Sequence, residues 1–285
     1  MKFSLILATV GRTVEVARLL ASFNAQRYRN FELIVVDQNP DDRLVAVLDP
    51  YQASFPILHL RSERGLSRAR NVGLKHVTGD VIAFPDDDCW YPESLLDDVF
   101  KDFTAHPEWD GMTGRSVDEK GEESAFSFGR HDGIIDRFSV WQQAISYTIF
   151  LRRRVIDRVG FFDETLGLGS GTQFGSGEET DYAVRAIQAG FRLYYLPRLF
   201  VHHPHPEEVI DQRILQRTFS YGCGMGRVLS KHRYPAWFKV RALIRPLGGV
   251  FVSLSKLAAP KAALHWQRCM GRVRGLCSGD FKETA

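Results

Sequence analysis

The chain lacks the cysteine patterns and the long apolar runs that mark several classes of protein. Its four cysteines are far apart and form neither a CxxC pair nor the Cys/His spacing of a zinc site. They are Cys89, Cys223, Cys269 and Cys277. We therefore expect reduced thiols and a cytoplasmic protein. Because no window of about 18 uninterrupted apolar residues occurs, we expect no membrane-spanning helix.

Targeting and nucleotide-binding fingerprints are absent as well. The apolar start of the chain is short and is followed by Gly11-Arg12 and Glu15 without a small-residue cleavage site, which argues against a signal peptide. The same turn has no GxGxxG, so a dinucleotide-binding fold is not indicated. Neither a GxxxxGK[ST] phosphate loop nor a GxSxG elbow is present. These absences leave no basis for a kinase.

The composition is that of an ordinary globular protein, but its charge is unevenly distributed. Apolar residues make up 44% and charged residues 25% of the 285 positions, enough for one large domain with or without an appendage. Residues 231–285 contain 11 Lys/Arg and 2 Asp/Glu, a net charge of +9, which leaves −6 for residues 1–230 if the total is +3. No nucleic-acid-binding module accompanies this charge, so we expect no nucleic acid partner. We expect either peripheral contact with an anionic membrane or a helical appendage packed on the core.

The first 105 residues alternate strand and helix patterns. Expected strands are Phe3–Ala8, Phe31–Val36, Pro56–Leu60 and Val81–Phe84, and expected helices are a segment starting at Thr13, Leu44–Leu48 and Ser67–His76. This alternation predicts an α/β fold with a Rossmann-like, mostly parallel sheet flanked by helices. Thr9, Asp37 and Asp86–Asp88 directly follow expected strands, so we expect them on one rim of the sheet.

The second half is less regular. We expect strands at Ile145–Leu151 and Phe191–Leu196, helices at Val155–Val159 and Glu178–Ala189, and a glycine-rich loop at Gly167–Gly177. Pro206–Leu229 is expected to be helical until Tyr221–Gly226 interrupts it. The expected domains are 1–230, with a nucleotide-binding half (1–105) and an acceptor and catalytic half (106–230), and a basic amphipathic C-terminal extension, 231–285. Acceptor contacts are expected from 111–145.

Three consecutive carboxylates, Asp86-Asp87-Asp88, end an apolar strand. Adjacent acids repel one another unless water or a cation offsets their charge. Mg²⁺ and Mn²⁺ prefer carboxylate oxygens, so a divalent metal with an anionic ligand would explain the triplet. The alternative is a solvated acidic turn capping a helix that starts near Pro92.

Several motifs, taken together and in order, carry a resemblance to a known family. They are Ser4–Thr9, Phe31–Asp37, the "GxxxARNxG" segment within Arg64–Gly73, Asp86–Asp88 at the place of a DxD motif, Val159–Glu164, and Gly177–Asp181 at a late acidic "ED" motif. Over residues 3–205 the chain resembles the inverting family 2 glycosyltransferases with the GT-A fold. The resemblance implies a nucleotide-diphosphate-sugar donor, with a UDP-sugar expected, and Mn²⁺ or Mg²⁺ as cofactor.

The resemblance also implies roles for individual residues. Thr9, Asp37, Arg70, Asp86 and Asp87 would bind the nucleotide. Asp88 and Asp86 would hold the metal, which offsets the charge of the leaving nucleoside diphosphate. Turn chemistry is the alternative for Thr9 and Asp37, and a solvated helix residue for Arg70. Of the three histidines His202, His203 and His205, His203 is the expected additional metal ligand.

The catalytic base is expected in the late acidic motif. Family members usually carry Glu-Asp where this chain has Glu178-Glu179, so Glu179 takes the place of the aspartate and would accept the proton of the acceptor hydroxyl. Asp181 and Glu178 are the fallback candidates. The S-x-x-E spacing of Ser176 and Glu179 is also that of a capping box, which leaves a structural role open for Glu179.

The sequence thus predicts an inverting, metal-dependent hexosyltransferase-type glycosyltransferase for polysaccharide or glycan biosynthesis. It would work on a glycan or lipid-linked acceptor in the cytoplasm, or peripherally on the inner face of the cell membrane. Two alternatives stay open: a nucleotidyltransferase, and a catalytically inactive nucleotide-sugar-binding or scaffold protein.

Overall fold

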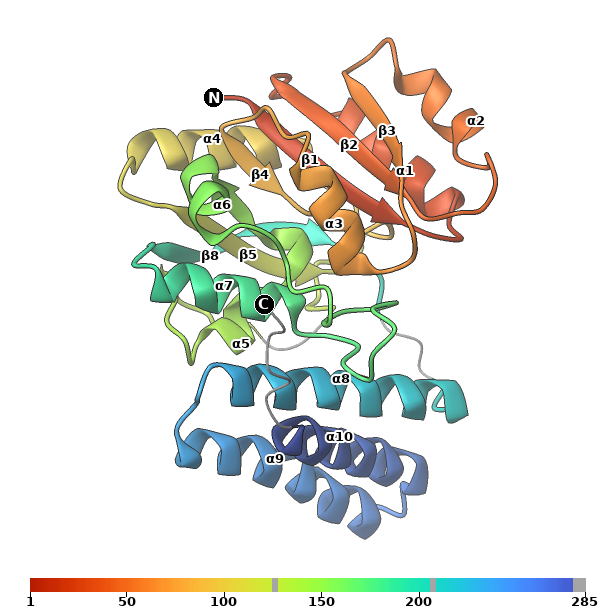
Figure 1. The fold of residues 1–285 in the computed structure, drawn as a ribbon, viewed down its shortest axis with the longest axis vertical. Coiled ribbons are helices and arrows are strands. Elements are labelled where there is room, and N and C mark those ends of the chain that lie inside the picture. Colours follow the sequence, from red (N-terminus) through yellow and green to blue (C-terminus); the bar gives the residue numbers. More distant parts are fainter. Residues whose placement is uncertain (125–127, 206–208, 279–285) are drawn as a thin grey trace, which may run out of the picture. The chain divides into compact units, whose positions relative to one another are not determined.

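A computed structural model describes residues 1–124, 128–205 and 209–278 (Figure 1). These residues form two compact units. The first contains 1–64, 68–124, 128–162 and 182–205, and the second contains 65–67, 163–181 and 209–278. Each unit is described separately below.

The first unit is built on one mixed sheet. Among the described residues its strands are β1 Phe3–Thr9, β2 Phe31–Asp37, β3 Ile57–Arg61, β4 Val81–Ala83, β5 Gly111–Val117, β6 Gly133–Ile134, β7 Phe150–Arg152 and β8 Leu193–His202. Their order across the sheet is β3-β2-β1-β4-β7-β5-β8-β6. The pairs β1–β2, β1–β4, β2–β3 and β5–β8 are parallel, whereas β7 and β6 pair antiparallel with their neighbours. The expected mostly parallel α/β sheet is confirmed.

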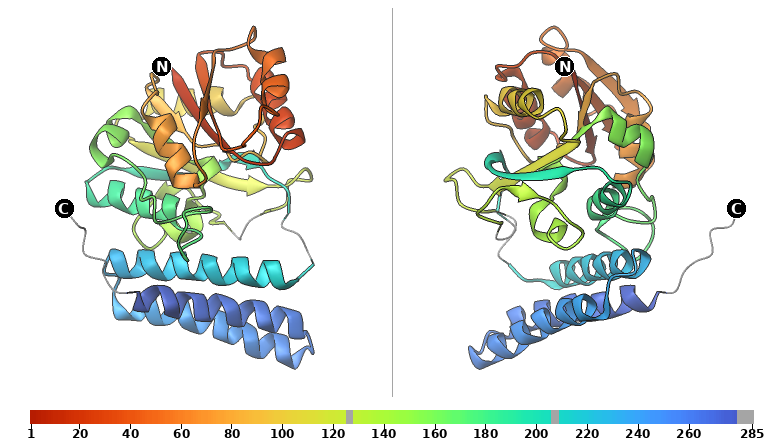
Figure 2. Two further views of the ribbon diagram at one scale, coloured as in Figure 1. Left: turned by 45° about the vertical axis from the view of Figure 1, so that its right-hand side comes forward. Right: turned by 90° about the vertical axis from the view of Figure 1, so that its left-hand side faces the viewer.

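Helices cover both faces of this sheet (Figure 2). They are α1 Val14–Asn24, α2 Val45–Leu48, α3 Leu66–Leu74, α4 Leu95–Ala105, α5 Val140–Gln143, α6 Arg153–Val159 and α7 Glu178–Gln188, with the short 3₁₀ turns η1 Asp49–Tyr51 and η2 Ser146–Thr148. All seven residues of β1 are buried, as expected for a central parallel strand covered on both sides. Leu5 and Leu7 join one buried cluster with Leu19 of α1 and Leu96 of α4.

The opposite face of β1 receives α3. A Cβ atom at Gly73 would lie 2.5 Å from Ile6 Cγ2, closer than side chains pack. The glycine therefore lets the helix approach the sheet, which is a packing reason for the last position of the "GxxxARNxG" segment.

The second half of the chain differs from the expectation in several places. β5, in the 111–145 region, was not expected as a strand, and residues 125–127 of that region lie outside the described residues. The expected strand Ile145–Leu151 is a 3₁₀ turn followed by the short β7, and β8 extends beyond Leu196 to His202. β7 pairs with both β4 and β5. This pairing is a tertiary contact that no local sequence pattern predicts, which explains why the bounds of β7 differ from the expectation.

Three long helices dominate the second unit: α8 Gln212–Lys231, α9 Ala236–Ser255 and α10 Ala259–Cys277. α10 packs against both α8 and α9. The expected interruption at Tyr221–Gly226 is wrong, because α8 is continuous there. Gly222 and Gly226 face Gly271 and Gly275 so closely that a Cβ atom at Gly222 would lie 2.7 Å from the Arg268 carbonyl oxygen. The glycines form a helix contact, and tertiary packing outweighs their weak helix propensity.

The structure groups α8 with α9 and α10 and not with the sheet. The expected domain boundary between residues 230 and 231 stays a prediction about independent folding. Over the residues that the structure describes, no helix is both long enough and apolar enough to cross a membrane.

The helix contact predicts opposite effects for the same substitution at two glycines. Gly271→Ala would press a methyl group against the Phe219 carbonyl oxygen, and we expect the free energy of unfolding to fall by roughly 2 kcal/mol. Gly248→Ala in α9 meets nothing within 4 Å and should raise it by up to about 1 kcal/mol, because alanine favours a helix. Urea unfolding of both variants measures the difference. Equal stability of the two would contradict the close contact.

Candidate active site

Polar side chains from three strands meet at the carboxyl ends of the sheet. Thr9 and Asp37 are paired residues at the ends of β1 and β2, and Ala8 forms a bridge to Asp86. The Thr9 hydroxyl donates to Asp87 Oδ2 at 2.8 Å. The expectation that these residues share one rim is therefore confirmed. The acidic triplet does not cap the next helix, because α4 begins at Leu95 with Ser94 at its N-cap position.

Asp86 is held by a buried arginine. Arg70, on α3, is 1% exposed and its Nη2 donates to Asp86 Oδ1 at 3.1 Å. Its guanidinium lies 5.8 Å and 5.5 Å from the ring centres of Phe84 and Phe162. Ser146 adds a longer contact of 3.3 Å to the same carboxylate oxygen. Arg70 is thus a fixed positive charge beneath the triplet, not a solvated helix residue.

Asp87 and Asp88 share a second arginine. Arg12 Nη1 lies 2.6 Å from Asp87 Oδ1 and 2.6 Å from Asp88 Oδ2. Burial raises the pKa of Asp87 to about 6, although Arg12 and Thr9 act against that rise. Burial also acts to raise the pKa of Asp88, but the hydrogen bond and charge of His203, together with Arg12, outweigh it and hold that pKa at about 2. Asp88 is therefore the carboxylate best kept ionised.

His203, directly after β8, faces Asp88. Its Nε2 is 3.2 Å from Asp88 Oδ1, and its Nδ1 is 2.7 Å from the Pro204 carbonyl oxygen. Because a carbonyl and an ionised carboxylate only accept, Nδ1 donates to Pro204 and Nε2 donates to Asp88. The ring of Tyr147 stacks on the imidazole at 4.9 Å. Burial lowers the pKa of His203, but the hydrogen bond and charge of Asp88 raise it further, and the net shift is upward.

This arrangement fits a divalent metal in its chemistry. Asp86 and Asp88 supply carboxylate oxygens, and the Nδ1 bond to a carbonyl orients the His203 ring as is usual for metal-binding histidines. In the part of the chain that the structure describes, no three His, Cys, Asp or Glu side chains form a ready-made metal cage. Mg²⁺ sites commonly use one or two carboxylates and complete their shell with substrate phosphates and water. An open site of this kind is what a metal–nucleotide pair requires.

The other two histidines do not join the triplet in the described contacts. His202 Nδ1 lies 3.0 Å from the Asp118 carbonyl oxygen, and its ring stacks on Trp90 at 5.1 Å. His205 Nε2 lies 3.0 Å from Asp118 Oδ2. Of the three, only His203 is placed as the sequence led us to expect for a metal ligand.

Asp37 is completely buried, and its carboxylate contacts Asn39, His59 and Arg61. Its Oδ1 accepts from the backbone and side-chain nitrogens of Asn39, both at 2.8 Å, and its Oδ2 lies 3.0 Å from both His59 Nε2 and Arg61 Nη1. Asn39 in turn accepts from the Gly11 backbone at 2.7 Å. Sequence reasoning missed Asn39, His59 and Arg61. Asn39 lies just beyond the end of β2, and His59 and Arg61 are alternate residues of β3, which was a usable signal.

The second unit contains the late acidic motif, at the start of α7. Asp181 is completely buried, and its Oδ1 is 2.8 Å from Lys231 Nζ and 2.8 Å from His232 Nε2. Lys231 also reaches Asp163 Oδ2 at 2.7 Å. Asp181 is therefore tied to two basic side chains of the α8 end, which is an arrangement for structural support.

The capping-box alternative for Glu179 is out of register. α7 begins at Glu178, and the Gly177 carbonyl accepts the first helical bond, from the Asp181 backbone at 2.8 Å. Gly177 thus occupies the N-cap position and Glu179 the second helical position. The Ser176 hydroxyl donates instead to the Tyr221 carbonyl oxygen at 3.0 Å. Glu178 and Glu179 thus lie at the positive end of the α7 dipole.

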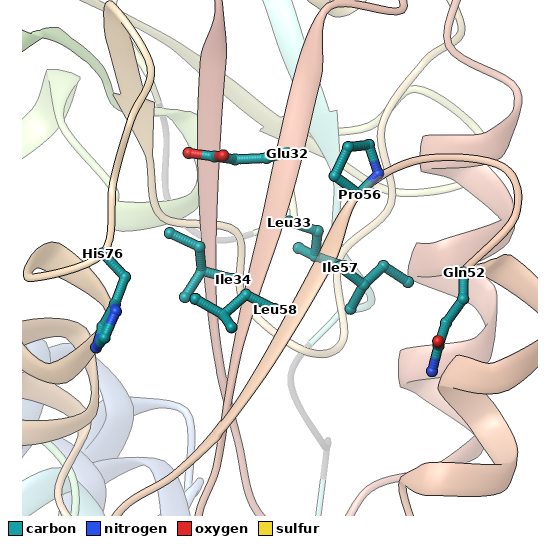
Figure 3. Close-up of a pocket in the computed structure, with 8 residues that line it drawn as sticks. All are labelled: Glu32, Leu33, Ile34, Gln52, Pro56, Ile57, Leu58 and His76. Carbon is teal, nitrogen blue, oxygen red and sulfur yellow. The ribbon is translucent and has the colours of Figure 1, made fainter.

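A cavity of about 320 Å³ lies elsewhere on the sheet (Figure 3). Its lining includes Glu32, Leu33 and Ile34 of β2, Ile57 and Leu58 of β3, and Gln52, Pro56 and His76. The strand residues among them lie in the first half of β2 and of β3, whereas the carboxylates follow the strand ends. Glu32 is already bonded to Lys2 and Ser4 at 2.6 Å each. The cavity is therefore separate from the candidate active site.

Comparison with solved structures identifies the fold class. A mannosyltransferase from Pyrobaculum calidifontis, in complex with GDP-Man and Mn²⁺, superposes with a TM-score of 0.69 over 98% of this chain and 88% of that chain, at 15% identity. S. aureus TarS 1-349, in complex with UDP-GlcNAc, superposes with a TM-score of 0.62 over 96% and 92%, at 16% identity. The chain has the GT-A fold of these transferases, as expected.

The sequence comparison identifies the family. The model of glycosyl transferase family 2 matches residues 4–160, more than half of the chain. This protein belongs to that family. A related uncharacterized glycosyltransferase from Haemophilus influenzae is 41% identical over 93 residues, 32% of this chain and 31% of that protein. The chain covers less than half the length of this and the next curated relatives.

The buried arginine gives a stability prediction with a neighbour as control. Arg70→Ala removes the partner of Asp86 and leaves a gap beside Phe84 and Phe162, so the free energy of unfolding should fall by about 3 kcal/mol. Arg68→Ala, two residues earlier on α3, loses an exposed pair with Glu63 and should cost no more than about 1 kcal/mol. Chemical denaturation compares the two. A cost for Arg70→Ala as small as that for Arg68→Ala would show that Arg70 is not a buried anchor.

Proposed function

We propose that the protein is an inverting glycosyltransferase that moves a sugar from a nucleoside-diphosphate sugar to an acceptor hydroxyl. The observation that carries this proposal is the set of carboxylates and cations at the ends of β1, β4 and β8. Three adjacent acids, a buried arginine and an oriented histidine at a sheet edge suit a metal-bound diphosphate. This set favours a glycosyltransferase over a nucleotidyltransferase or a scaffold protein. Membership of family 2 supports the same choice.

The donor-binding residues in this proposal are Thr9, Asp37, Arg70, Asp86 and Asp87. Asp37 acts indirectly, through the loop after β2. Its carboxylate accepts two hydrogen bonds from Asn39, and Asn39 in turn accepts one from the Gly11 backbone. Arg70 fixes the Asp86 carboxylate so that it presents its remaining oxygen surface in one orientation. A rigid site of this kind lowers the ordering cost of binding.

Asp88, Asp86 and His203 would hold Mn²⁺ or Mg²⁺. When bound, the metal would supply Lewis-acid stabilisation of the charge that develops on the diphosphate. The protein's own part is to keep Asp88 ionised, to aim the imidazole nitrogen at it, and to hold the diphosphate end of the donor at the sheet edge. The Mn²⁺ complex of the Pyrobaculum mannosyltransferase supports a divalent ion here.

Glu179 is the proposed catalytic base. It would take the proton of the acceptor hydroxyl while that oxygen bonds to the anomeric carbon and the bond from that carbon to the diphosphate oxygen breaks. The electron pair leaves with the nucleoside diphosphate. A single displacement of this kind inverts the anomeric configuration. Glu178 is the next candidate, whereas the two basic partners of Asp181 make it the weakest of the three.

A UDP-sugar is the proposed donor, and a GDP-sugar is the competing choice. TarS binds UDP-GlcNAc and the Pyrobaculum enzyme binds GDP-Man, so the fold accepts both bases. A glycan or lipid-linked acceptor in polysaccharide or glycan biosynthesis completes the proposal.

Nucleotide binding and turnover test the proposal separately. Thermal unfolding with UDP, GDP and other nucleoside diphosphates, each with and without Mn²⁺, should show a metal-dependent rise with one base, worth about 2.7 kcal/mol at a hundred times the Kd. Asp88→Asn should lose this rise. Glu179→Gln should keep it and lose at least about a hundredfold in transfer rate.

Asp157→Asn, which changes an exposed carboxylate paired with Arg153, serves as the matched control for both measurements. The product's anomeric configuration is read by NMR. Retention of configuration, or an active Glu179→Gln, would contradict the assigned chemistry. The absence of any nucleotide effect would move the scaffold alternative to the front.

We further propose that α9 contacts an anionic membrane surface. α8, α9 and α10 contain no acidic residue. α9 buries Phe238, Ala242 and Pro246 on one side, while Trp237, Ile244 and Phe251 are exposed on the other. Their spacing of seven residues, with Val240 between the first two, forms one apolar stripe, and Arg241 and Arg245 flank it. An exposed apolar stripe bordered by basic residues is typical of helices that lie on anionic lipid.

Vesicle binding tests this contact. The protein should sediment with vesicles containing phosphatidylglycerol, more weakly in high salt and more weakly with phosphatidylcholine alone. Ile244→Glu with Phe251→Glu should lower the partition coefficient at least about tenfold, because two apolar groups of the lipid-facing stripe become charged. Val14→Glu, at an exposed apolar residue of α1, is the control. Unaltered partition of the double variant would rule out the α9 stripe as the contact.

A further inference from the structure

Arg12 holds two of the three carboxylates with a single nitrogen. Its Nη1 is 2.6 Å from one oxygen each of Asp87 and Asp88. Both carboxylates therefore turn an oxygen toward the same positively charged atom. A divalent metal on Asp88 requires negatively charged oxygens of the same kind. The guanidinium nitrogen and such a metal compete for the Asp88 carboxylate.

Arg12 is far more exposed than Arg70, the arginine that pairs with the first carboxylate of the triplet. Arg70 is 1% exposed and lies near two phenylalanine rings, whereas the Arg12 side chain is 39% exposed. Arg12 belongs to the turn between β1 and α1, not to either element. Gly11 before it has φ +77°, and nothing lies within 4 Å of where its Cβ would be. The turn thus has open space beside it.

The charges around the triplet determine whether Arg12 stays in contact with it when a metal binds. Without a metal, Arg12, Arg70 and the imidazole of His203 together face the three carboxylates. A divalent ion placed on Asp88 beside an unmoved Arg12 would set like charges next to each other, which opposes binding. Release of Arg12 from the carboxylates removes that repulsion. The released side chain then lies beside the proposed diphosphate site.

We propose that Arg12 is a built-in counter-ion of Asp87 and Asp88, that the divalent metal displaces it, and that the released guanidinium binds the diphosphate of the nucleotide. This inference rests on the proposed metal and nucleotide site. Arginine matches phosphate oxygens with two parallel charge-assisted hydrogen bonds, so the displaced side chain gains a new partner only when nucleotide is present. Metal alone then binds weakly, and metal and nucleotide bind cooperatively.

Mn²⁺ titration of the full chain tests the exchange, with free Mn²⁺ measured by electron paramagnetic resonance. Arg12→Gln should bind Mn²⁺ alone about tenfold more tightly than the unmodified protein, because the competing charge is gone. Saturating UDP or GDP should enhance its Mn²⁺ affinity about tenfold less than it does in the unmodified protein. Arg12→Lys keeps the charge and should bind Mn²⁺ alone within about threefold of the unmodified protein.

Arg27→Gln, which removes an exposed arginine paired with Glu93 at 3.9 Å, is the matched control. Arg12→Met repeats the neutral substitution if the glutamine variant does not unfold cooperatively. Mn²⁺ affinity that is equal or weaker in the neutral variants overturns the competition, and unchanged enhancement by nucleotide overturns the transfer to the diphosphate. A protein that binds Mn²⁺ but no nucleotide would contradict the proposed function, while the nucleotide-free titration would still decide the competition.

Discussion

Electrostatic repulsion among three consecutive carboxylates is the constraint on which this site depends. Asp86, Asp87 and Asp88 follow a buried strand, where water offsets little of their charge. Three basic side chains of different exposure offset this charge. Arg70 is buried and contacts Asp86, Arg12 bridges Asp87 and Asp88 from a turn, and His203 contacts Asp88. Burial raises the pKa of Asp87, whereas His203 and Arg12 together lower the pKa of Asp88 against the effect of burial.

The sheet brings these groups together by register. Parallel pairing aligns Thr9 with Asp37 and Ala8 with Asp86, so residues far apart in the sequence end at one edge. β8 contributes from the other half of the chain, because its extension to His202 puts His203 next to Asp88. One layer of backbone hydrogen bonds thus determines which side chains meet, and the helices on each face hold that layer in place.

The parallel βα units and the strand-end position of Thr9, Asp37 and the triplet could be predicted, because hydrophobic periodicity and strand order are local signals. Arg12 could not, since a lone basic residue in a turn has no pattern of its own. β5 was missed and the bounds of β7 were wrong, because the pairing of both strands is set by distant segments. The glycines of α8 were misread because local propensity says nothing of a partner helix whose backbone needs the space.

That partner helix has a consequence for how the chain is made. Gly222 faces Arg268–Arg272 and Gly226 faces Arg272–Gly275, so α8 and α10 run in the same direction, and α9 is the return passage between them. During synthesis α8 is made first, and the surface formed by Gly222 and Gly226 is covered only after α9 and α10 have been made. Until α10 leaves the ribosome, that stretch of backbone is open to water and to chaperones, which makes the order of synthesis part of how this unit reaches its folded state.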